Sequence, residues 1–234
     1  MLAFALVVFG CARSPQKAYP GVARHSAPAL LVVLGSSTAA GTGPAHLREA
    51  WVPRYTTYLQ QRFPDFSLVN LAVSGQNSYQ IQASDFAPPG NRPRPVAGKN
   101  ISAALALHPN AIIVNMPSND TAENFSVAEQ LANFERVVAL ATTAHVMVWL
   151  TSTQPRNFTN EAQLTTLKQV RDALFHDYAP RTLDFWTPFA NADGTIKPSF
   201  SAGDGIHLNA AAHSVLEDTV IAAHIPEAAL ARAN

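Results

Sequence analysis

Short apolar runs alternate with longer amphipathic stretches from residue 29 to the end of the chain. Most of the runs are almost continuously apolar, which is typical of strands buried on both faces of a parallel sheet. Five such runs are present, at residues 29–34, 66–72, 111–116, 145–150 and 182–185. The pattern therefore predicts five strands separated by helical segments.

Three polar positions predict where helices begin. Ser126 and Glu129 form a capping box, after which apolar residues recur at helical spacing as far as Ala141. Asn160 and Asn209 can cap two further helices. Strands that alternate with helices imply a doubly wound α/β sheet, in which right-handed crossovers place helices on both faces.

Residues 85–100 break this alternation. The segment DFAPPGNRPRPVAGKN is rich in proline and cannot form a regular element. It predicts a surface loop near the strand ends, which is either a solvated crossover or part of the wall of a binding pocket.

The composition excludes several classes of protein. The 16 Lys and Arg residues balance the 16 Asp and Glu residues, whereas a domain that binds nucleic acid usually carries a basic excess. The single cysteine cannot form a disulfide within the chain, and the eight histidines are scattered. The sequence therefore predicts no nucleic-acid partner, no metal and no other cofactor, and it leaves the oligomeric state open.

The N-terminus has the pattern of an export signal. Residues 2–10 form an unbroken apolar run that is too short to span a bilayer as a helix but suits a secretory signal peptide. The string VFGC at residues 8–11 resembles a bacterial lipoprotein signal, in which the cysteine becomes the lipidated first residue. The chain departs from that pattern because no Lys or Arg precedes the run and because Phe9 is bulky.

We therefore predict a signal peptide at residues 1–11 with Cys11 as the lipidation site, a linker at 12–27 and the folded domain at 28–234. This organisation predicts an exported bacterial protein, either periplasmic or attached to a membrane through Cys11. The alternative is a terminus without a targeting role, in which Cys11 is chemically inert.

Chemically useful side chains follow the predicted strands. In doubly wound sheets the ligand crevice lies beyond the carboxyl ends of the strands. The segments at or near those ends include GSSTAAGTG at 35–43, VSGQN at 73–77, PSND at 117–120 and GDGIHLN at 203–209. A hydroxyl, a glycine, an amide and a carboxylate–imidazole pair are therefore expected at one edge of the sheet.

In this order, the segments resemble the sequence blocks of the SGNH (GDSL-type) hydrolases over about residues 29–224. LGSSTAAG resembles the nucleophile block, with Ser37 at the nucleophile position and Ser36 where the family often has Asp. DGIH resembles the D-x-x-H block and contains Asp204 and His207. The resemblance implies a three-layer α/β/α sandwich with a flavodoxin-like parallel sheet of five strands in the order 2-1-3-4-5.

The resemblance also implies a serine esterase with a Ser-His-Asp triad. A serine hydroxyl is a poor nucleophile at neutral pH, so it needs an adjacent base, which a third group must orient. Because Asp204 and His207 are three residues apart in one turn, the carboxylate can accept the Nδ1 proton and leave Nε2 facing Ser37. The implied substrate is a carboxylic ester of a small molecule or a glycan, and export favours short-chain acyl or acetyl esters.

Attack on an ester produces an oxyanion that needs preorganised donors. The family pattern implies the backbone N–H groups of Ser37 and Gly75 and the side-chain amide of Asn119. Pro117 replaces the usual Gly of the third block. In the 2-1-3 order the first strand lies between the other two, so Gly75 and Asn119 are expected to flank Ser37. Three residues after the fourth strand are candidates to line the pocket, namely Thr153, Gln154 and Arg156.

Other interpretations stay open at this point. Ser37 can instead cap the helix that follows it, Asn119 can bond only its own turn, and Asp120 is interpreted as stabilising that turn. A catalytically inactive SGNH-type domain that binds glycan would keep the same fold. GSSTAAGTG also faintly resembles the phosphate loop of flavodoxins, although a flavin-binding protein would leave Asp204 and His207 without a role.

Overall fold

The computed structural model describes residues 28–233, and all five predicted strands are present at its centre. They are β1 (Ala29–Gly35), β2 (Phe66–Asn70), β3 (Ala111–Asn115), β4 (Met147–Thr151) and β5 (Thr182–Leu183). The strands run parallel in the order β2-β1-β3-β4-β5, which confirms the order that the family resemblance implied. The carboxyl end of β1 therefore lies between those of β2 and β3.

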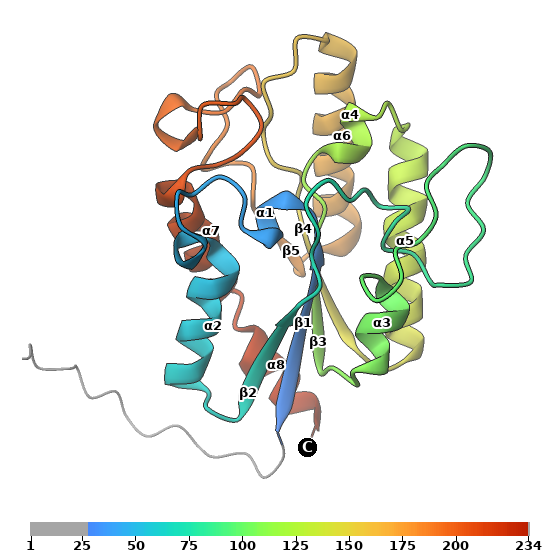
Figure 1. The fold of residues 1–234 in the computed structure, drawn as a ribbon, viewed down its shortest axis with the longest axis vertical. Helices are drawn as coiled ribbons and strands as arrows, with labels where there is room; N and C mark the ends of the chain where they lie inside the picture. Colours follow the sequence, from blue (N-terminus) through green and yellow to red (C-terminus); the bar gives the residue numbers. More distant parts are fainter. Residues whose placement is uncertain (1–27, 234) are drawn as a thin grey trace, which may run out of the picture.

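Helices cover both faces of the sheet, as expected for a three-layer α/β/α sandwich (Figure 1). One face carries α2 (Trp51–Arg62), α7 (Ala210–Ala222) and α8 (Ile225–Ala233), and the other carries α3 (Ile101–Ala106), α5 (Val127–Thr143) and α6 (Glu161–Tyr178). Alternate residues of β1 enter the two cores, because successive side chains of a strand point to opposite faces. Leu31 and Val33 belong to the core beneath α2, whereas Val32 and Leu34 belong to the core beneath α5.

Short helices occupy the segments between these elements. α1 (Ser37–Ala40) follows β1, and α4 (Asn119–Ala122) follows β3. Two single turns of 3-10 helix, η1 (Leu47–Glu49) and η2 (Pro198–Phe200), precede α2 and α7. In Figure 1, α1 and α4 lie beyond the carboxyl ends of the strands.

The three predicted helix caps are present. In the capping box of α5, Ser126 Oγ accepts the N–H of Glu129 at 3.2 Å, and Glu129 Oε2 accepts the N–H of Ser126 at 2.9 Å. Asn160 and Asn209 each accept an N–H from the first turn of α6 and α7, respectively. The cap at Asn209 fixes the start of α7 directly after the DGIH motif.

Residues 85–100 form no regular element and lie on the outer side of α5 (Figure 1). Arg92 of this segment pairs with Glu129 at 2.7 Å, and its guanidinium lies 4.2 Å from the ring centroid of Phe125. The N–H of Val96 donates to the carbonyl of Gln80 at 2.9 Å. These contacts hold the segment against α5 as a surface loop, and none of them involves the segment after β1 or the DGIH motif.

The predicted signal peptide, Cys11 and the linker lie outside the described residues. Their assignment as an export and lipidation signal stays a prediction. Within residues 28–233, no helix has both the length and the apolar character needed to cross a membrane.

Candidate active site

Ser37 is the first residue of α1, which begins directly after β1. Gly35 allows this abrupt change of direction, because a Cβ there would lie 2.7 Å from the Cβ of Ala39 and 2.9 Å from the carbonyl oxygen of Asn115. The N-cap of α1 is Ser36, so the interpretation of Ser37 as the capping residue is wrong. Ser37 is 6% exposed, and its hydroxyl has no hydrogen-bond partner within residues 28–233.

Asn119 joins the segments that follow three neighbouring strands. Its Nδ2 donates to Ser36 Oγ at 2.7 Å and to the carbonyl of Gln76 at 2.8 Å. The interpretation in which Asn119 bonds only its own turn is therefore wrong. Gln76 follows Gly75, which adopts the left-handed conformation that favours glycine, with φ +86°. The immediate neighbours of Ser37 and Gly75 thus meet at the amide of Asn119.

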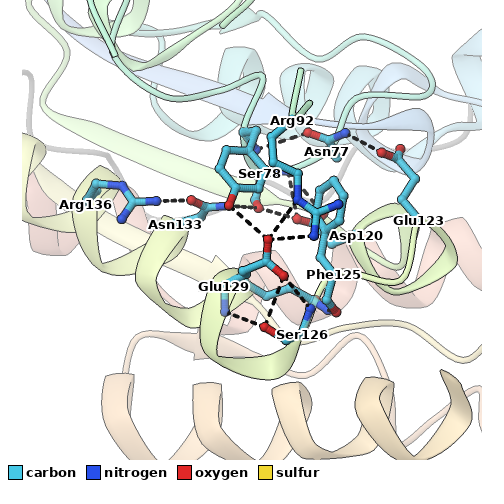
Figure 2. Close-up of polar contacts among 12 residues, drawn as sticks. Asn77, Ser78, Arg92, Asp120, Glu123, Phe125, Ser126, Glu129, Asn133 and Arg136 are labelled. Carbon is cyan, nitrogen blue, oxygen red and sulfur yellow. Dashed lines mark hydrogen bonds and ion pairs between the residues drawn. The ribbon is translucent and has the colours of Figure 1, made fainter. Parts of the chain in front are cut away.

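A polar network surrounds Asp120, the buried residue that follows Asn119 in the chain (Figure 2). The carboxylate of Asp120 accepts the backbone N–H of Ser78 at 3.0 Å and also accepts the Ser78 hydroxyl. Asn133 of α5 donates to Ser78 Oγ at 2.7 Å. Asp120 therefore ties the segment after β2 to α4, which goes beyond the expected role of stabilising its own turn.

This network makes a prediction about stability. Burial raises the pKa of Asp120 to about 6 from its usual 3.8, although hydrogen bonds from Ser78 oppose the shift. A carboxyl whose pKa rises on folding stabilises the fold fully below pH 3.8 and loses that contribution as the pH rises through about 6. Relative to wild type, Asp120→Asn is expected to gain on the order of 3 kcal/mol in free energy of unfolding between pH 4 and pH 8.

Urea unfolding of both proteins across this pH range measures the difference. Glu123→Gln is the control, because it replaces an exposed carboxylate of the same network. A difference between wild type and Asp120→Asn that does not change with pH would contradict the prediction.

The loop between η2 and α7 holds Asp204 and His207 together. Asp204 Oδ2 lies 2.5 Å from Nδ1 of His207, and Oδ1 accepts the backbone N–H groups of Ile206 at 2.9 Å and His207 at 2.8 Å. Burial acts to raise the pKa of Asp204, but the N–H and imidazole of His207 and the N–H of Ile206 outweigh it and lower that pKa to about 2. The carboxylate is thus ionised at neutral pH, and Nε2 of the imidazole is left for another partner.

The DGIH loop contacts the segment that follows α1. Gly43 has φ +121°, and a Cβ there would lie 2.0 Å from the carbonyl oxygen of Leu208 and 3.4 Å from the Cβ of His207. The preceding residue, Thr42, lies with its hydroxyl 2.9 Å from that of Ser74. The segments that contain Ser37, Gly75 and His207 therefore adjoin one another.

The three candidate pocket residues differ in their surroundings. Thr153 is buried, and its hydroxyl donates to the carbonyl of Leu167 in α6 at 3.1 Å. Gln154 is also buried, and its amide bonds protein groups on both sides. Arg156 is half-buried, with Nη1 3.5 Å from Ser118 Oγ, and burial lowers the pKa of its guanidinium. Arg156 is thus the one of the three whose surroundings leave it accessible to a substrate.

Sequence reasoning missed two polar residues of the site. Thr38 bonds Gln154, and Ser78 bonds Asp120. Both lie within or next to the quoted segments, at positions to which the family pattern gives no role. The only indication of their role in the sequence was that each carries a hydroxyl and lies in a segment that follows a buried strand.

Comparison with known proteins identifies the family of this chain. The family model of the GDSL-like lipase/acylhydrolase family matches residues 33–215. No curated protein matches the chain in sequence.

Several solved structures share the fold. The esterase EstA from Pseudoalteromonas sp. is 18% identical with a TM-score of 0.59, covering 82% of this chain and 94% of its own. TesA is 21% identical with a TM-score of 0.59, covering 82% and 96%. A mutant of Axe2, an acetyl-xylooligosaccharide esterase from Geobacillus Stearmophilus, is 16% identical with a TM-score of 0.62, covering 86% and 95%.

The family match spans most of the chain, from within β1 to within α7, and therefore includes the segments that contain Ser37, Gly75, Asn119, Asp204 and His207. At these identities the structural neighbours show the shared fold, and the family match assigns the class of reaction. The chain belongs to the GDSL-like lipase/acylhydrolase family and is a hydrolase that acts on ester bonds.

Proposed function

We propose that this hydrolase is a serine esterase with Ser37 as nucleophile, His207 as general base and Asp204 as the group that orients the imidazole. The observation that carries the proposal is the 2.5 Å contact between Asp204 Oδ2 and His207 Nδ1, on a loop that adjoins the segment after α1. An ionised carboxylate at Nδ1 favours the tautomer with its proton there. Nε2 is then the acceptor for the proton of Ser37.

The reaction proceeds in two halves. Ser37 Oγ bonds to the ester carbonyl carbon while His207 Nε2 takes the hydroxyl proton, and the carbonyl oxygen becomes an oxyanion. Collapse of this intermediate breaks the bond to the alcohol oxygen, which receives the proton from His207. Water then attacks the acyl-enzyme in the same manner, and Ser37 recovers its proton as the carboxylic acid leaves.

The oxyanion would be stabilised by donors from three segments. The N–H of Ser37 lies at the start of α1, where backbone N–H groups have no partner within the helix. The N–H of Gly75 and the Nδ2 of Asn119 complete the set. Asn119 reaches this point by turning its N–H from Ser36 Oγ to the oxyanion, while its second N–H stays on the carbonyl of Gln76.

Removal of the Asn119 amide tests this assignment. Asn119→Ala is expected to lower kcat by about 10²–10³-fold with little change in KM, because the lost bond forms chiefly in the transition state. Steady-state kinetics on one soluble ester measure both constants, and circular dichroism verifies the fold. A kcat within threefold of wild type would exclude Asn119 from the oxyanion hole.

For the substrate, we propose short-chain acyl or acetyl esters, including those of carbohydrates. The fold similarity to an acetyl-xylooligosaccharide esterase supports this choice, although fold alone does not select a substrate. Half-buried Arg156 is the proposed contact with the substrate beside Ser118. Hydrolysis of p-nitrophenyl esters of increasing chain length, together with acetylated xylan oligosaccharides, tests the proposal. Preference for long acyl chains would contradict it.

An inactive domain that binds glycan is the second candidate, and a covalent probe separates it from an esterase. One of the similar structures is the esterase EstA inhibited by monoethylphosphonate. An alkyl phosphonate with a good leaving group is expected to label Ser37 alone, as located by mass spectrometry of peptides. A protein that binds acetylated glycan but neither reacts with the phosphonate nor hydrolyses any ester would establish the binding function instead.

A further inference from the structure

The side chain of Gln154 lies between α1, which contains the proposed nucleophile, and the DGIH loop, which contains the proposed base. Gln154 follows β4 and is 1% exposed. Its Oε1 accepts the hydroxyl of Thr38 at 2.7 Å, and its Nε2 donates to the carbonyl of Ile206 at 3.1 Å. One amide therefore joins the residue after Ser37 to the residue before His207.

Within residues 28–233, no hydrogen bond joins α1 directly to residues 204–207, so the two are bonded only through Gln154. The DGIH loop is also held by its own turn, by the N–H of Ala202, which donates to the carbonyl of His207 at 2.9 Å, and by the N–H of Asn157, which donates to the carbonyl of Gly205 at 2.8 Å. The N–H of Gln154 itself donates to the carbonyl of Pro117 at 3.3 Å, in the segment that leads to Asn119. The backbone of Gln154 is thus bonded to the segment after β3, and its side chain bonds both α1 and the DGIH loop.

We propose that Gln154 is a positioning residue that sets the separation of Ser37 Oγ and His207 Nε2 by bridging Thr38 and Ile206. This role rests on the proposed function of Ser37 and His207. Glutamine suits it because the end of its side chain offers one acceptor for the hydroxyl and one donor for the carbonyl. An apolar residue of similar size would leave the buried hydroxyl of Thr38 and the carbonyl of half-buried Ile206 without their partner, so α1 and the DGIH loop would move to find other partners.

Loss of the bridge should lower the rate of proton transfer from Ser37 to His207. A misplacement of about 1 Å between reacting groups can lower a rate by about 10²-fold. Gln154→Leu is therefore expected to lower kcat by about 10–100-fold, with KM within about threefold of wild type. The second-order rate constant for labelling of Ser37 by an alkyl phosphonate should fall by a similar factor, because that reaction uses the same nucleophile and base.

Gln130→Leu is the matched control. Gln130 is 3% exposed, and its amide bonds the hydroxyl of Thr121 at 3.2 Å and the carbonyl of Phe125 at 2.9 Å. The same substitution therefore removes bonds to a buried hydroxyl and to a backbone carbonyl, but between α5 and the stretch from α4 to Phe125. A role of Gln154 in stability alone predicts that the two variants lose thermal stability and kcat to the same extent.

Thr38 tests the bridge from its other end, and it keeps the proposal testable if Gln154→Leu does not fold. Thr38→Val should reproduce the loss of kcat, whereas Thr38→Ser should restore it because the hydroxyl remains. The double variant Thr38→Val with Gln154→Leu should lose little more than either single variant, because both remove one interaction.

The proposal is supported if Gln154→Leu or Thr38→Val lowers both kcat and the labelling rate at least tenfold more than Gln130→Leu does. It is overturned if these variants stay within threefold of Gln130→Leu, or if their effects on kcat simply add. Turnover and labelling by the wild-type protein test the proposed function separately. A wild type that shows neither would refute the esterase assignment and the bridge with it.

Discussion

Ser37→Ala is expected to lower kcat/KM for a short-chain ester by about 10⁴–10⁶-fold while the protein stays folded. The methyl group of alanine cannot bond to the ester carbonyl, so only the oxyanion donors and substrate binding would remain to act on a water molecule. The hydroxyl of Ser37 has no hydrogen-bond partner within residues 28–233, so its removal leaves no described group unpaired. Steady-state kinetics and a thermal unfolding curve measure the two effects.

Ser36→Ala is the matched control, because it deletes the hydroxyl of the adjacent residue. Ser36 Oγ accepts Nδ2 of Asn119, which would keep its second contact with the carbonyl of Gln76. A loss of about tenfold or less is therefore expected, since the amide stays held on one side. Near-native turnover by Ser37→Ala together with an inactive Ser36→Ala would exchange the roles of these two serines.

The sheet could be predicted from the sequence because its central strands β1, β3 and β4 are buried on both faces. β1 and β3 are continuous apolar runs for that reason, and their positions agree with the prediction to within one residue. The strand order came from the family resemblance, because an apolar run does not reveal its neighbour in the sheet. α1 was not separately delimited, since four small residues give no helical period.

Side-chain direction limited the prediction of the site. Thr153, Gln154 and Arg156 all follow β4, and the sequence offered the same role for each. The fold turns the hydroxyl of Thr153 towards α6 and the amide of Gln154 towards α1 and the DGIH loop, and Arg156 remains half-buried. Contacts between segments remote in the chain produced this difference, and no local pattern encodes them.

Asp204 and His207 could be paired from sequence because their contact is local. Three residues separate them within one turn, and the backbone N–H groups of Ile206 and His207 in that turn bond Asp204 Oδ1. The partner of Nε2 depends on the packing of the Gly43 segment against this loop. The pairing of His207 Nε2 with Ser37 was therefore predicted from the family resemblance, and substitutions of these two residues test it.

His207→Ala is expected to lower kcat/KM nearly as much as the triple replacement of Ser37, Asp204 and His207, by about 10⁵–10⁶-fold. Because the three residues carry out one proton transfer, replacing a second of them after the first should lower kcat/KM little further. Asp204→Ala should lower it less, by about 10³–10⁵-fold, because the imidazole can still accept a proton without its orienting partner. Additive losses in the double and triple variants would show that these residues act independently.

The dependence of kcat/KM on pH should distinguish which group supplies the base. The pKa of Asp204 is lowered to about 2, so its carboxylate is ionised throughout the range from pH 5 to pH 8 and cannot produce a change there. The proposed base must be neutral to accept the proton of Ser37, so protonation of the imidazole removes the acceptor. We therefore expect kcat/KM to fall as the pH is lowered from 8 to 5, by up to tenfold per pH unit at the acid end. Activity that stays constant down to pH 5, or a fully active His207→Ala, would show that a group other than the DGIH histidine takes the proton.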